Sequence, residues 1–286
     1  MLERVLSFLP DKLYLQIMFF KHFKRFINFR DPITYNEKLQ WLKIYDRNPL
    51  YTTLVDKYTV KDYVSKKIGN RYVIPTLGCW NDASEINFQS LPNQFVLKWN
   101  HDSGSVIICK DKSTFNIKEA VRRLNKAKKH NGYLYGREWP YKGVKPKIIA
   151  EQYMEDEKTK ELRDYKFFVF NGKVKALFIA SDRQNKNKET KFDFFDEKFN
   201  HLAITNGHPN SESLPEKPIR FDEMISLAEL LGNGIPHVRV DFYEVDGNIF
   251  FGEMTFFHWS GFMPFNPVKW DKQFGEWITL PSNTIK

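Results

Sequence analysis

Two segments near the C-terminal end combine carboxylates and an arginine on a predicted pair of strands. In residues 237–242 (HVRVDF), Arg239 and Asp241 alternate with apolar residues and therefore share one face of a strand. The following segment, residues 249–255, carries Glu253. Carboxylate oxygens are hard ligands that suit Mg²⁺, and an arginine beside them suits a phosphate group. Asp241 and Glu253 are therefore candidate metal ligands, and Arg239 is a candidate catalytic cation.

The relative position of these two carboxylates depends on the turn at Asp246-Gly247-Asn248. A three-residue loop or a bulged turn places Asp241 directly opposite Glu253, whereas a two-residue turn places them on opposite faces of the sheet. Opposed carboxylates repel each other unless a proton or a cation lies between them. The alternative interpretation is a solvated sheet face that carries an ion pair, so the hairpin alone does not decide the chemistry.

A second candidate site lies around Lys98, at the end of the apolar segment 95–98. Residues 101–105 (HDSGS) fit a phosphate-binding loop, because backbone N–H groups and the lysine ammonium would both face anionic oxygens. The stretch lacks the Gly-Lys-Ser/Thr spacing of a Walker A loop. Residues 148–154 (IIAEQYM) could pair with a purine edge and line its ring; the alternative is a buried strand end.

These residues require a scaffold of helices and antiparallel hairpins. Apolar periodicity predicts helices over 12–27, 36–44, 56–67, 116–129 and 221–231, and strands over 95–98, 105–109, 148–154, 165–170, 173–180, 192–195, 237–244 and 249–255. Asn171-Gly172, between two of these strands, is a strong hairpin signal. Residues 131–140 (NGYLYGREWP) are either a functional loop or an aromatic-rich surface loop. Helices and hairpins in separate blocks predict an α+β fold.

The composition excludes several classes of protein. Among 286 residues, 44 Lys and Arg against 35 Asp and Glu leave a net charge of +9, and aromatic residues make up 16%. A chain of this kind is globular rather than disordered, and its many rings must be buried or stacked. Cys79 and Cys109 are too few for a disulfide framework or a four-ligand zinc site, which favours a cytoplasmic location. The positive charges are dispersed, so no nucleic-acid partner is expected.

The N-terminal region predicts a soluble protein that could touch a membrane. No signal peptide and no run of about 20 apolar residues is recognisable. The predicted helix 12–27 has apolar residues at helical spacing with cations beside them: Leu13, Ile17, Phe20 and Phe23, with Lys21, Lys24 and Arg25. We expect this helix to dock on the protein body. Contact with an acidic glycan or with the inner face of the membrane is the alternative.

Taken in order along the chain, Lys98 with its small loop, residues 151–154, Arg239-x-Asp241 and Gly252-Glu253 resemble the ATP-grasp superfamily. More closely, the chain from about residue 9 to residue 265 resembles the TupA-like branch of that superfamily, named for teichuronopeptide biosynthesis. Further segments carry this likeness: Leu9-Pro-Asp-Lys-Leu, Asn36-Glu-Lys-Leu-Gln-Trp41, Asp56-Lys-Tyr58, Arg137-Glu-Trp139, Arg163-Asp-Tyr-Lys166-Phe, Ser181-Asp-Arg183 and Gly252-Glu-Met-Thr-Phe256.

The resemblance implies two α+β lobes that hold ATP between them, preceded by a short helical region. The expected boundaries are 1–55 for the helical region, 56–147 for the N-terminal lobe and 148–286 for the C-terminal lobe. It also implies an ATP- and Mg²⁺-dependent ligase that activates a carboxylate as an acyl phosphate, which an amine attacks to form an amide. The TupA-like branch implies a uronic acid of a capsular or cell-wall polysaccharide, or its precursor, as the carboxylate, and a small molecule as the amine.

The same resemblance assigns roles to individual residues. The implied nucleotide-binding residues are Lys57 and Lys98 at the phosphates, Ser103, Gly104 and Ser105 in the closing loop, Glu151, Gln152, Tyr153 and Met154 at the adenine, and Asp164 at the ribose. Asp241 and Glu253 would hold Mg²⁺. Arg239 and Lys166 would neutralise charge on the transferred phosphoryl group.

Two departures from the family pattern bear on the metal and the acceptor. Thr255 stands where many ATP-grasp enzymes have an asparagine, and a hydroxyl is a poorer metal ligand than an amide oxygen, which weakens the case for a second Mg²⁺. The helical region, roughly 55 residues by pattern, is shorter than the domain with which many relatives contact the acceptor. The acceptor contacts are therefore expected from residues in long loops: Arg137, Glu138, Trp139, Arg183 and His258.

Two other functions fit the same features. Paired carboxylates with a divalent cation could hold a nucleotide sugar in a glycosyltransferase of polysaccharide biosynthesis, and release of UDP or GDP would identify such an enzyme. A non-catalytic module could use the aromatic rings and the basic surface to bind acidic glycans. That module would bind glycan without binding Mg-ATP.

Overall fold

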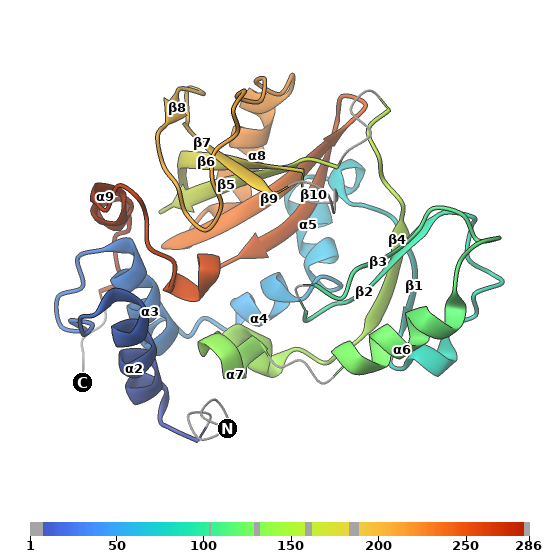
Figure 1. Cartoon of the computed structure of the whole chain (residues 1–286), viewed down its shortest axis with the longest axis horizontal. Coiled ribbons are helices and arrows are strands. Elements are labelled where there is room, and N and C mark those ends of the chain that lie inside the picture. The colour runs from blue at the N-terminus through green and yellow to red at the C-terminus, as the bar shows by residue number, and fades with distance from the viewer. Residues whose placement is uncertain (1–7, 103, 129–131, 158–161, 183–188, 283–286) are drawn as a thin grey trace.

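Two antiparallel sheets organise the chain in the computed structural model, which describes residues 8–102, 104–128, 132–157, 162–182 and 189–282 (Figure 1). The strand order of the small sheet is β1 (Thr76–Trp80), β4 (Ile148–Gln152), β2 (Phe95–Trp99) and β3 (Ile107–Cys109). The strand order of the large sheet is β10 (Asn248–Thr255), β9 (His237–Val245), β5 (Asp164–Phe170), β6 (Lys173–Ser181), β7 (Lys191–Asp196) and β8 (His201–Leu202). The predicted α+β class is confirmed.

Helices pack on both sheets and form the N-terminal end of the described chain (Figure 1). The α-helices are α2 (Asp11–Phe23), α3 (Tyr35–Tyr45), α4 (Leu50–Val55), α5 (Val60–Ile68), α6 (Ile117–Ala127), α7 (Gly132–Gly136), α8 (Phe221–Gly232) and α9 (Lys269–Trp277). Short 3₁₀ segments are η1 (Asn70–Tyr72), η2 (Ala83–Glu85), η3 (Trp139–Gly143) and η4 (His258–Gly261). In the part of the chain that the structure describes, none of these helices is long and apolar enough to cross a bilayer.

Strand β5 lies inside the large sheet and is buried along its whole length. On one face of the sheet, the ring of Phe167 lies 6.0 Å from that of Phe221 in α8. On the other face, Phe168 lies 6.3 Å from Tyr35 in α3 and 5.3 Å from Phe274 in α9. Burying each such ring stabilises the fold by about 1.5 to 3 kcal/mol. The N-terminal helices and the large sheet therefore share one aromatic-rich core.

The β9–β10 hairpin turns through two residues. Val245 pairs with Asn248, and the two residues between them have left-handed φ values of 49° and 74°. These values are the ones that two-residue hairpin turns require, and the second belongs to Gly247, which adopts them without steric cost. A two-residue turn alone would place Asp241 and Glu253 on opposite faces of the sheet.

A β-bulge at Gly252 reverses that consequence. The register shifts by one residue between Phe251 and Glu253, so that Glu253 pairs with Asp241. Glycine suits this position because a Cβ atom there would lie 3.1 Å from the backbone oxygen of Asp241, closer than ordinary van der Waals contact. The two carboxylates are opposed, as a bulged turn would have made them, but the bulge lies within the strand and not in the turn.

Helix α2 differs from its prediction in its end and in its buried face. It ends at Phe23, before the expected residue 27, because Lys24 adopts a left-handed conformation with a φ of 57°. The helix does dock on the protein body, but it does so through Tyr14, Leu15 and Phe19. Three of the residues that periodicity had selected for docking are exposed instead: Leu13, Ile17 and Phe20. Periodicity could not separate the two faces, because both are apolar.

Other differences concern short elements. Residues 131–140, expected to be a loop, contain α7 and the beginning of η3. Helices α4 and α9 and strands β1 and β8 were not predicted, because short segments carry too few periods to be recognised. Strand β4, which the predicted boundary at residue 148 assigned to the C-terminal lobe, pairs with β1 and β2 in the small sheet. Alternation within a strand does not show which sheet the strand joins.

Candidate active site

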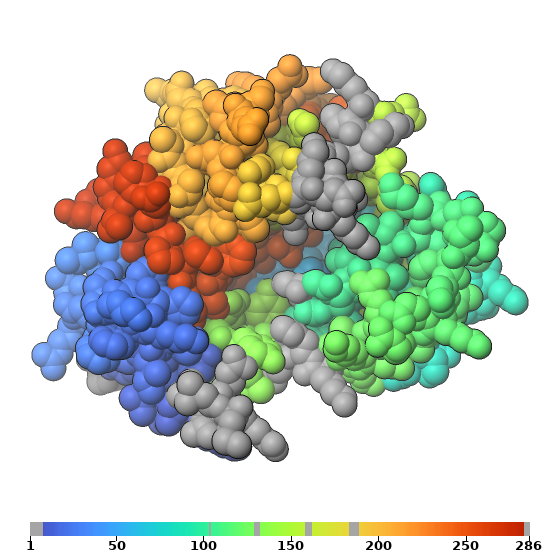
Figure 2. Space-filling view, viewed as in Figure 1, coloured from blue at the N-terminus to red at the C-terminus, as the bar shows by residue number. Residues whose placement is uncertain are grey.

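Two cavities meet at the side chains of Lys166 and Glu253, which line both of them. The inter-sheet cavity, about 470 Å³, has walls from the small sheet and from strands of the large sheet. The aromatic cavity, about 630 Å³, lies between large-sheet residues and the segment of α7 and η3, and it is named for its rings: Tyr135, Tyr141, Phe178, Phe192, Phe257 and Trp259. In Figure 2, yellow-green residues that include α7 lie between the N-terminal helices (blue) and the small-sheet region (green).

The inter-sheet cavity brings together most of the residues predicted to bind a nucleotide: Lys57, Lys98, Gly104, Glu151, Gln152, Tyr153, Met154 and Asp164. Apolar side chains such as Val96 and Ile108 line the rest of its wall. Ser105 is not part of the lining, since its buried hydroxyl accepts a hydrogen bond from Trp99 N–H at 3.3 Å. Ser103 lies outside the described residues. Cations and apolar walls in one cavity suit a polyphosphate joined to a flat ring.

Glu151 holds Lys98 and a second lysine, Lys61 of α5. Its carboxylate lies 2.5 Å from Lys98 Nζ and 2.7 Å from Lys61 Nζ. Burial alone would raise the pKa of Glu151, but the two ammonium groups lower it below its ordinary value. Glu151 therefore positions two cations, a role that the sequence did not suggest. Lys61 itself was not predicted; its spacing of four residues from Lys57, in a segment expected to be helical, was the available signal.

The loop after β2 is held by the segment that precedes α5. Asn100 Nδ2 donates to Asp56 Oδ1 at 2.8 Å, and Lys57 Nζ donates to the backbone oxygen of Asp102 at 3.0 Å. Lys57 Nζ also lies 3.4 Å from Glu253 Oε2. Lys57 therefore connects the loop of the small sheet with the large sheet at the inter-sheet cavity.

Asp241 is fully buried and surrounded by cations. Arg239 donates to both of its carboxylate oxygens, from Nε at 2.7 Å and from Nη2 at 2.8 Å. Lys166, its cross-strand neighbour on β5, also contacts Asp241 and lies 3.1 Å from Asp164 Oδ1. Burial alone would lower the pKa of Arg239, but Asp241 and Glu253 raise it above its ordinary value. Both oxygens of Asp241 are thus already engaged.

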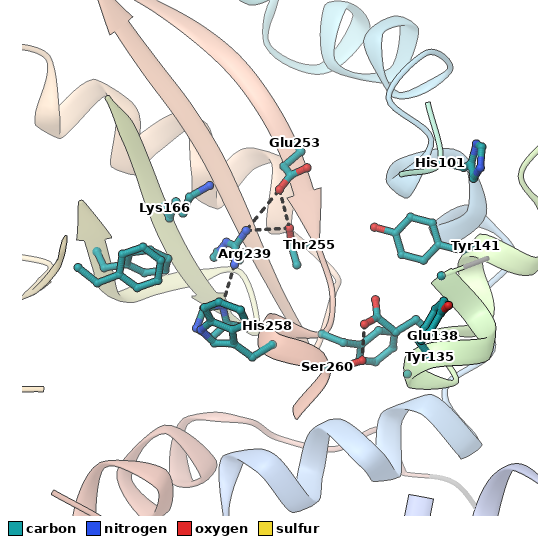
Figure 3. A pocket seen from close by; sticks show the side chains of 16 residues that line it. His101, Tyr135, Glu138, Tyr141, Lys166, Arg239, Glu253, Thr255, His258 and Ser260 are labelled. Carbon is teal, nitrogen blue, oxygen red and sulfur yellow. Dashed lines mark hydrogen bonds and ion pairs between the residues drawn. The ribbon is translucent and has the colours of Figure 1, made fainter. Parts of the chain in front are cut away.

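Glu253 is the carboxylate that faces both cavities, and 31% of its side chain is exposed. Arg239 Nη2 lies 3.4 Å from Glu253 Oε1 and 3.0 Å from Thr255 Oγ1 (Figure 3). Glu253 fits a Mg²⁺ ligand, whereas Asp241 could join only by giving up a hydrogen bond to a cation. Among the described residues, no cluster of three or more His, Cys, Asp and Glu side chains could hold a metal. Phosphate oxygens and water would therefore complete the shell, as is common for Mg²⁺.

His258, which was predicted to contact the acceptor, lines the aromatic cavity and contacts Arg239. Its Nδ1 lies 2.7 Å from Arg239 Nη1 (Figure 3), and its Nε2 lies 2.9 Å from Asn206 Oδ1. Because an arginine can only donate, Nδ1 accepts and Nε2 carries the proton that Asn206 accepts. Burial, together with the charge of Arg239, lowers the pKa of His258 well below its ordinary value. The ring is therefore neutral at physiological pH.

The opposite wall of the aromatic cavity carries a half-buried carboxylate, Glu138 (Figure 3). Glu138 Oε1 accepts a hydrogen bond from Ser260 Oγ at 2.5 Å. Burial raises the pKa of Glu138, and the nearby charge of Lys43 opposes that shift. The cavity is thus lined by Arg239 and Lys166 with the carboxylate of Glu253 on one side, and by the carboxylate of Glu138 on the other. Charged groups of both signs suit a ligand pair of opposite charge.

Ser260 lies in a segment whose backbone conformation is unusual. Trp259, Ser260 and Gly261 have consecutive left-handed φ values of 48°, 55° and 65°, which cost energy at the two residues that are not glycine. Helix α3 stabilises this segment. Gln40 Nε2 donates to the backbone oxygens of Ser260 and Gly261 at 3.1 and 2.8 Å, and Lys43 Nζ donates to that of Ser260 at 2.7 Å. The N-terminal helices therefore help to shape the aromatic cavity.

Two further residues predicted to contact the acceptor, Arg137 and Trp139, do not line the aromatic cavity. Arg137 is 2% exposed, and its guanidinium lies 4.4 Å from the centre of the Tyr14 ring in α2. Trp139 packs beside Tyr51, with ring centres 6.0 Å apart. Both side chains fasten the segment of α7 and η3 to the N-terminal helices, a burial that motif spacing could not reveal. Arg183 lies outside the described residues.

One comparison with known proteins identifies a family. The sequence model of a family described as TupA-like ATP-grasp matches residues 37–279. No match is found among curated proteins.

Solved structures with a similar backbone include two D-alanine–D-alanine ligases and the ATP-grasp ligase PsnB. The Helicobacter pylori ligase has 14% identity and a TM-score of 0.46, over 86% of this chain and 69% of that one. The Bacillus anthracis ligase complexed with ATP has 14% identity and a TM-score of 0.40, over 71% and 53%. PsnB, complexed with a variant of its minimal precursor, Mg and ADP, has 12% identity and a TM-score of 0.42, over 77% and 57%. The chain thus spans only 53% of the first ATP-bound ligase and 57% of PsnB.

Proposed function

Because the chain belongs to the TupA-like ATP-grasp family, we propose that it is an ATP- and Mg²⁺-dependent ligase that joins a carboxylate to an amine. The observation that carries this proposal is the meeting of two cavities at Lys166 and Glu253. One cavity has the lining that a nucleotide needs, and the other has Arg239, Lys166 and Glu253 on one side and Glu138 on the other. A phosphoryl group at their junction would lie within reach of a substrate in the aromatic cavity.

ATP would occupy the inter-sheet cavity. Lys57 and Lys98 would contact its phosphates, Tyr153 and Met154 would line the adenine, and Asp164 would bind the ribose. Glu151 would serve this site indirectly, by holding Lys98 beside the phosphates through their 2.5 Å ion pair. Gln152 and Gly104 would complete the wall on either side of the nucleotide.

At the junction, Glu253 would hold Mg²⁺, with Asp241 joining if Arg239 moved its hydrogen bonds to the substrate. The metal ion, when bound, would offset the negative charge that phosphoryl transfer concentrates on the phosphate oxygens. Arg239 and Lys166 would add two fixed positive charges at the same place, oriented by Asp241 and His258. These side chains are held before substrate arrives, so little reorganisation is needed during reaction.

The ligase reaction would proceed in two steps. A carboxylate oxygen of the acceptor attacks the γ-phosphorus, and the bond to the ADP oxygen breaks, which leaves an acyl phosphate and ADP. The bound ammonium group first loses a proton to water, and the neutral nitrogen then attacks the acyl carbon. The bond to phosphate breaks, and the nitrogen gives its second proton to the departing phosphate to form the amide. Arg239 would position the carboxylate, Glu138 would bind the protonated amine before attack, and the surrounding rings would exclude water from the acyl phosphate.

For the acceptor we propose a uronic acid of a capsular or cell-wall polysaccharide, or its precursor, and for the amine a small molecule. The aromatic walls, including Tyr141 and Trp259, support a sugar acceptor because rings stack on sugar faces while their polar edges bind hydroxyl groups. The cytoplasm, where ATP is made, is the proposed location. The inner face of the membrane would be the place of reaction if the acceptor were lipid-linked.

The direct test is to incubate the protein with ATP, Mg²⁺ and panels of uronic acids and amines. Release of ADP and phosphate that requires both a carboxylate and an amine, with an amide product of the expected mass, would support the ligase. Release of UDP or GDP from a sugar nucleotide, with ATP untouched, would support a glycosyltransferase instead. Binding of acidic glycan without binding of Mg-ATP would leave only a glycan-binding module.

Replacing Lys98 by Ala is expected to weaken the affinity for Mg-ATP by about 10- to 100-fold, the loss of one charged hydrogen bond. Glu151 keeps its second partner, Lys61, so the variant should still fold. Titration calorimetry with a non-hydrolysable ATP analogue measures the effect. Lys118→Ala, an exposed lysine of α6, is the matched control. Equal affinities in both variants would remove Lys98 from the phosphate site.

Replacing Glu138 by Gln is expected to raise the KM for the amine by about tenfold or more, because a neutral amide attracts an ammonium group less than a carboxylate does. The KM values for ATP and for the carboxylate should stay near those of the wild type. Steady-state kinetics with each substrate varied in turn separates these constants, and Glu276→Gln, exposed on α9, serves as the control. A uniform change of all three constants would contradict the amine-binding role.

A further inference from the structure

Helix α2 carries large apolar side chains on two sides. One side, which includes Leu15 and Phe19, is completely buried against the protein body. On the other side Leu13, Ile17 and Phe20 are 48%, 38% and 44% exposed. Their spacing of four and three residues places them on one face of the helix. Burial in the core does not account for this second apolar face.

The exposed face continues beyond the end of α2. The ring of Phe26, 65% exposed, stacks on that of Phe20 with centres 4.9 Å apart. Leu13, Ile17, Phe20 and Phe26 form what we call the apolar stripe. Figure 1 places α2 at the outer edge of the molecule, near the N-terminal end. Contiguous exposed apolar side chains of this size mark a surface that binds something.

The charges beside the apolar stripe are positive. Residues 8–30 contain five Lys and Arg and a single acidic residue, Asp11. That carboxylate is engaged by Tyr133 and lies 3.5 Å from Arg137 Nε. Lys21 and Lys24 are both exposed. Lys21 lies four residues after Ile17 and so continues the same face, and Lys24 directly follows the last residue of the helix. The described residues 8–30 therefore combine apolar side chains with an excess of cations, and the next acidic side chain, the exposed Asp31, follows directly.

We propose that the apolar stripe, with Lys21 and Lys24, is an interfacial membrane-binding surface for an anionic leaflet. Its apolar side chains would enter the headgroup region, and each nearby cation would contribute about 1 kcal/mol of attraction. A lipid surface is favoured over a protein partner because the cations lie at the end of the stripe, where headgroup phosphates would meet them. The helix is fixed in place by its buried face, so little ordering would be needed on binding.

The position of α2 gives this surface a use. On the buried side of the helix, the hydroxyl of Tyr14 donates to the backbone oxygen of Tyr135 at 2.9 Å, and Tyr135 lines the aromatic cavity. A membrane contacted by the stripe would therefore lie beside the proposed acceptor cavity. The membrane contact itself does not depend on the ligase proposal; only this link to a lipid-linked acceptor rests on it.

Co-sedimentation of the whole protein with vesicles tests the proposal. One set of vesicles is phosphatidylcholine alone, and the other contains phosphatidylglycerol as well. We expect binding to the anionic vesicles that falls as salt is added, and little binding to the neutral ones. Two variants, Ile17→Ser with Phe20→Ser and Lys21→Glu with Lys24→Glu, should each weaken binding by about tenfold or more. The control is Ile219→Ser with Val268→Ser, since these side chains are 90% and 76% exposed elsewhere.

Three results would overturn the proposal. The wild type could fail to bind anionic vesicles, or the variants could bind as tightly as the wild type and the control. Alternatively, light scattering could reveal a dimer that Ile17→Ser with Phe20→Ser converts to a monomer, which would assign the stripe to a second copy of the chain. Ligase activity on soluble substrates is measured on the same samples. A wild-type protein without this activity would count against the proposed ligase function, but it would not change what the vesicle experiment says about membrane binding.

Discussion

Replacing Glu253 by Gln is expected to lower the rate of ATP turnover by about 100- to 1,000-fold, with the fold retained. Glutamine has nearly the same shape as glutamate but no charge, so it cannot balance Mg²⁺ or the ammonium of Lys57, which lies 3.4 Å away. The side chain is partly exposed, so the substitution should cost little stability. ADP release at saturating ATP, measured over a range of Mg²⁺ concentrations, reports the effect.

The matched control for Glu253 is Glu244→Gln. Glu244 lies on the same hairpin and accepts a hydrogen bond from the backbone N–H of Arg220, which glutamine can also accept. It does not line either cavity. Turnover should therefore stay near that of the wild type. If Glu253→Gln and Glu244→Gln have similar activities, the metal-binding role of Glu253 is ruled out.

Replacing Asp241 by Asn is expected mainly to lower the free energy of unfolding, by about 3 to 5 kcal/mol. This is the cost of leaving buried cations without their counter-charge. From the sequence alone, this substitution would be expected to affect only metal binding and to leave the fold intact. The structure changes that expectation, because Arg239 and Lys166 converge on a carboxylate that is fully buried. Activity should fall as well, since Arg239 would lose the partner that orients it.

Urea denaturation measures the loss of stability in Asp241→Asn as a lower midpoint. Asp246→Asn, in the turn of the same hairpin, is the control, because asparagine tolerates the left-handed conformation found there. Its midpoint should match that of the wild type. A variant at Asp241 that unfolds at the wild-type midpoint but has lost activity would instead favour the purely metal-binding role that the sequence suggested.

Most of the residues expected to bind the nucleotide were selected by the resemblance to the ATP-grasp superfamily, and their nucleotide-binding roles stay predictions. Lys98 and Asp164 are two of them, and both line the inter-sheet cavity. The pairing of Lys166 with Asp241 depends on which strand lies beside β5, a long-range property that periodicity does not contain. Lys61 escaped notice for the same reason, since its partner Glu151 is 90 residues away in the sequence.

The residues expected to contact the acceptor were harder to predict, because they lie in loops. Glu138 and His258, two of these residues, line the aromatic cavity, and their contact with an acceptor stays a prediction. Arg137 resembles a substrate-binding arginine in the sequence, but the aromatic rings of the N-terminal region bury it. Ser260 was not predicted, because its position depends on hydrogen bonds from α3 that stabilise an unusual backbone. The role of a loop residue is decided by such tertiary contacts, and these contacts produce no recognisable sequence motif.

The bulge at Gly252 also limits how the hairpin can change in evolution. Because side chains alternate, deletion of one residue between Asp241 and Glu253 would turn the glutamate toward the apolar face of the sheet, and deletion of two would not. The two-residue turn by itself would place Glu253 on the face opposite to Asp241, and the extra residue of the bulge returns Glu253 to the same face. A deletion of Gly252 could therefore be compensated by one residue inserted into the turn. Relatives of this protein could thus place the same pair of carboxylates opposite each other with a different turn length and without the bulge. A sequence alignment that does not allow for this exchange between turn and bulge would misplace one of the two acidic residues.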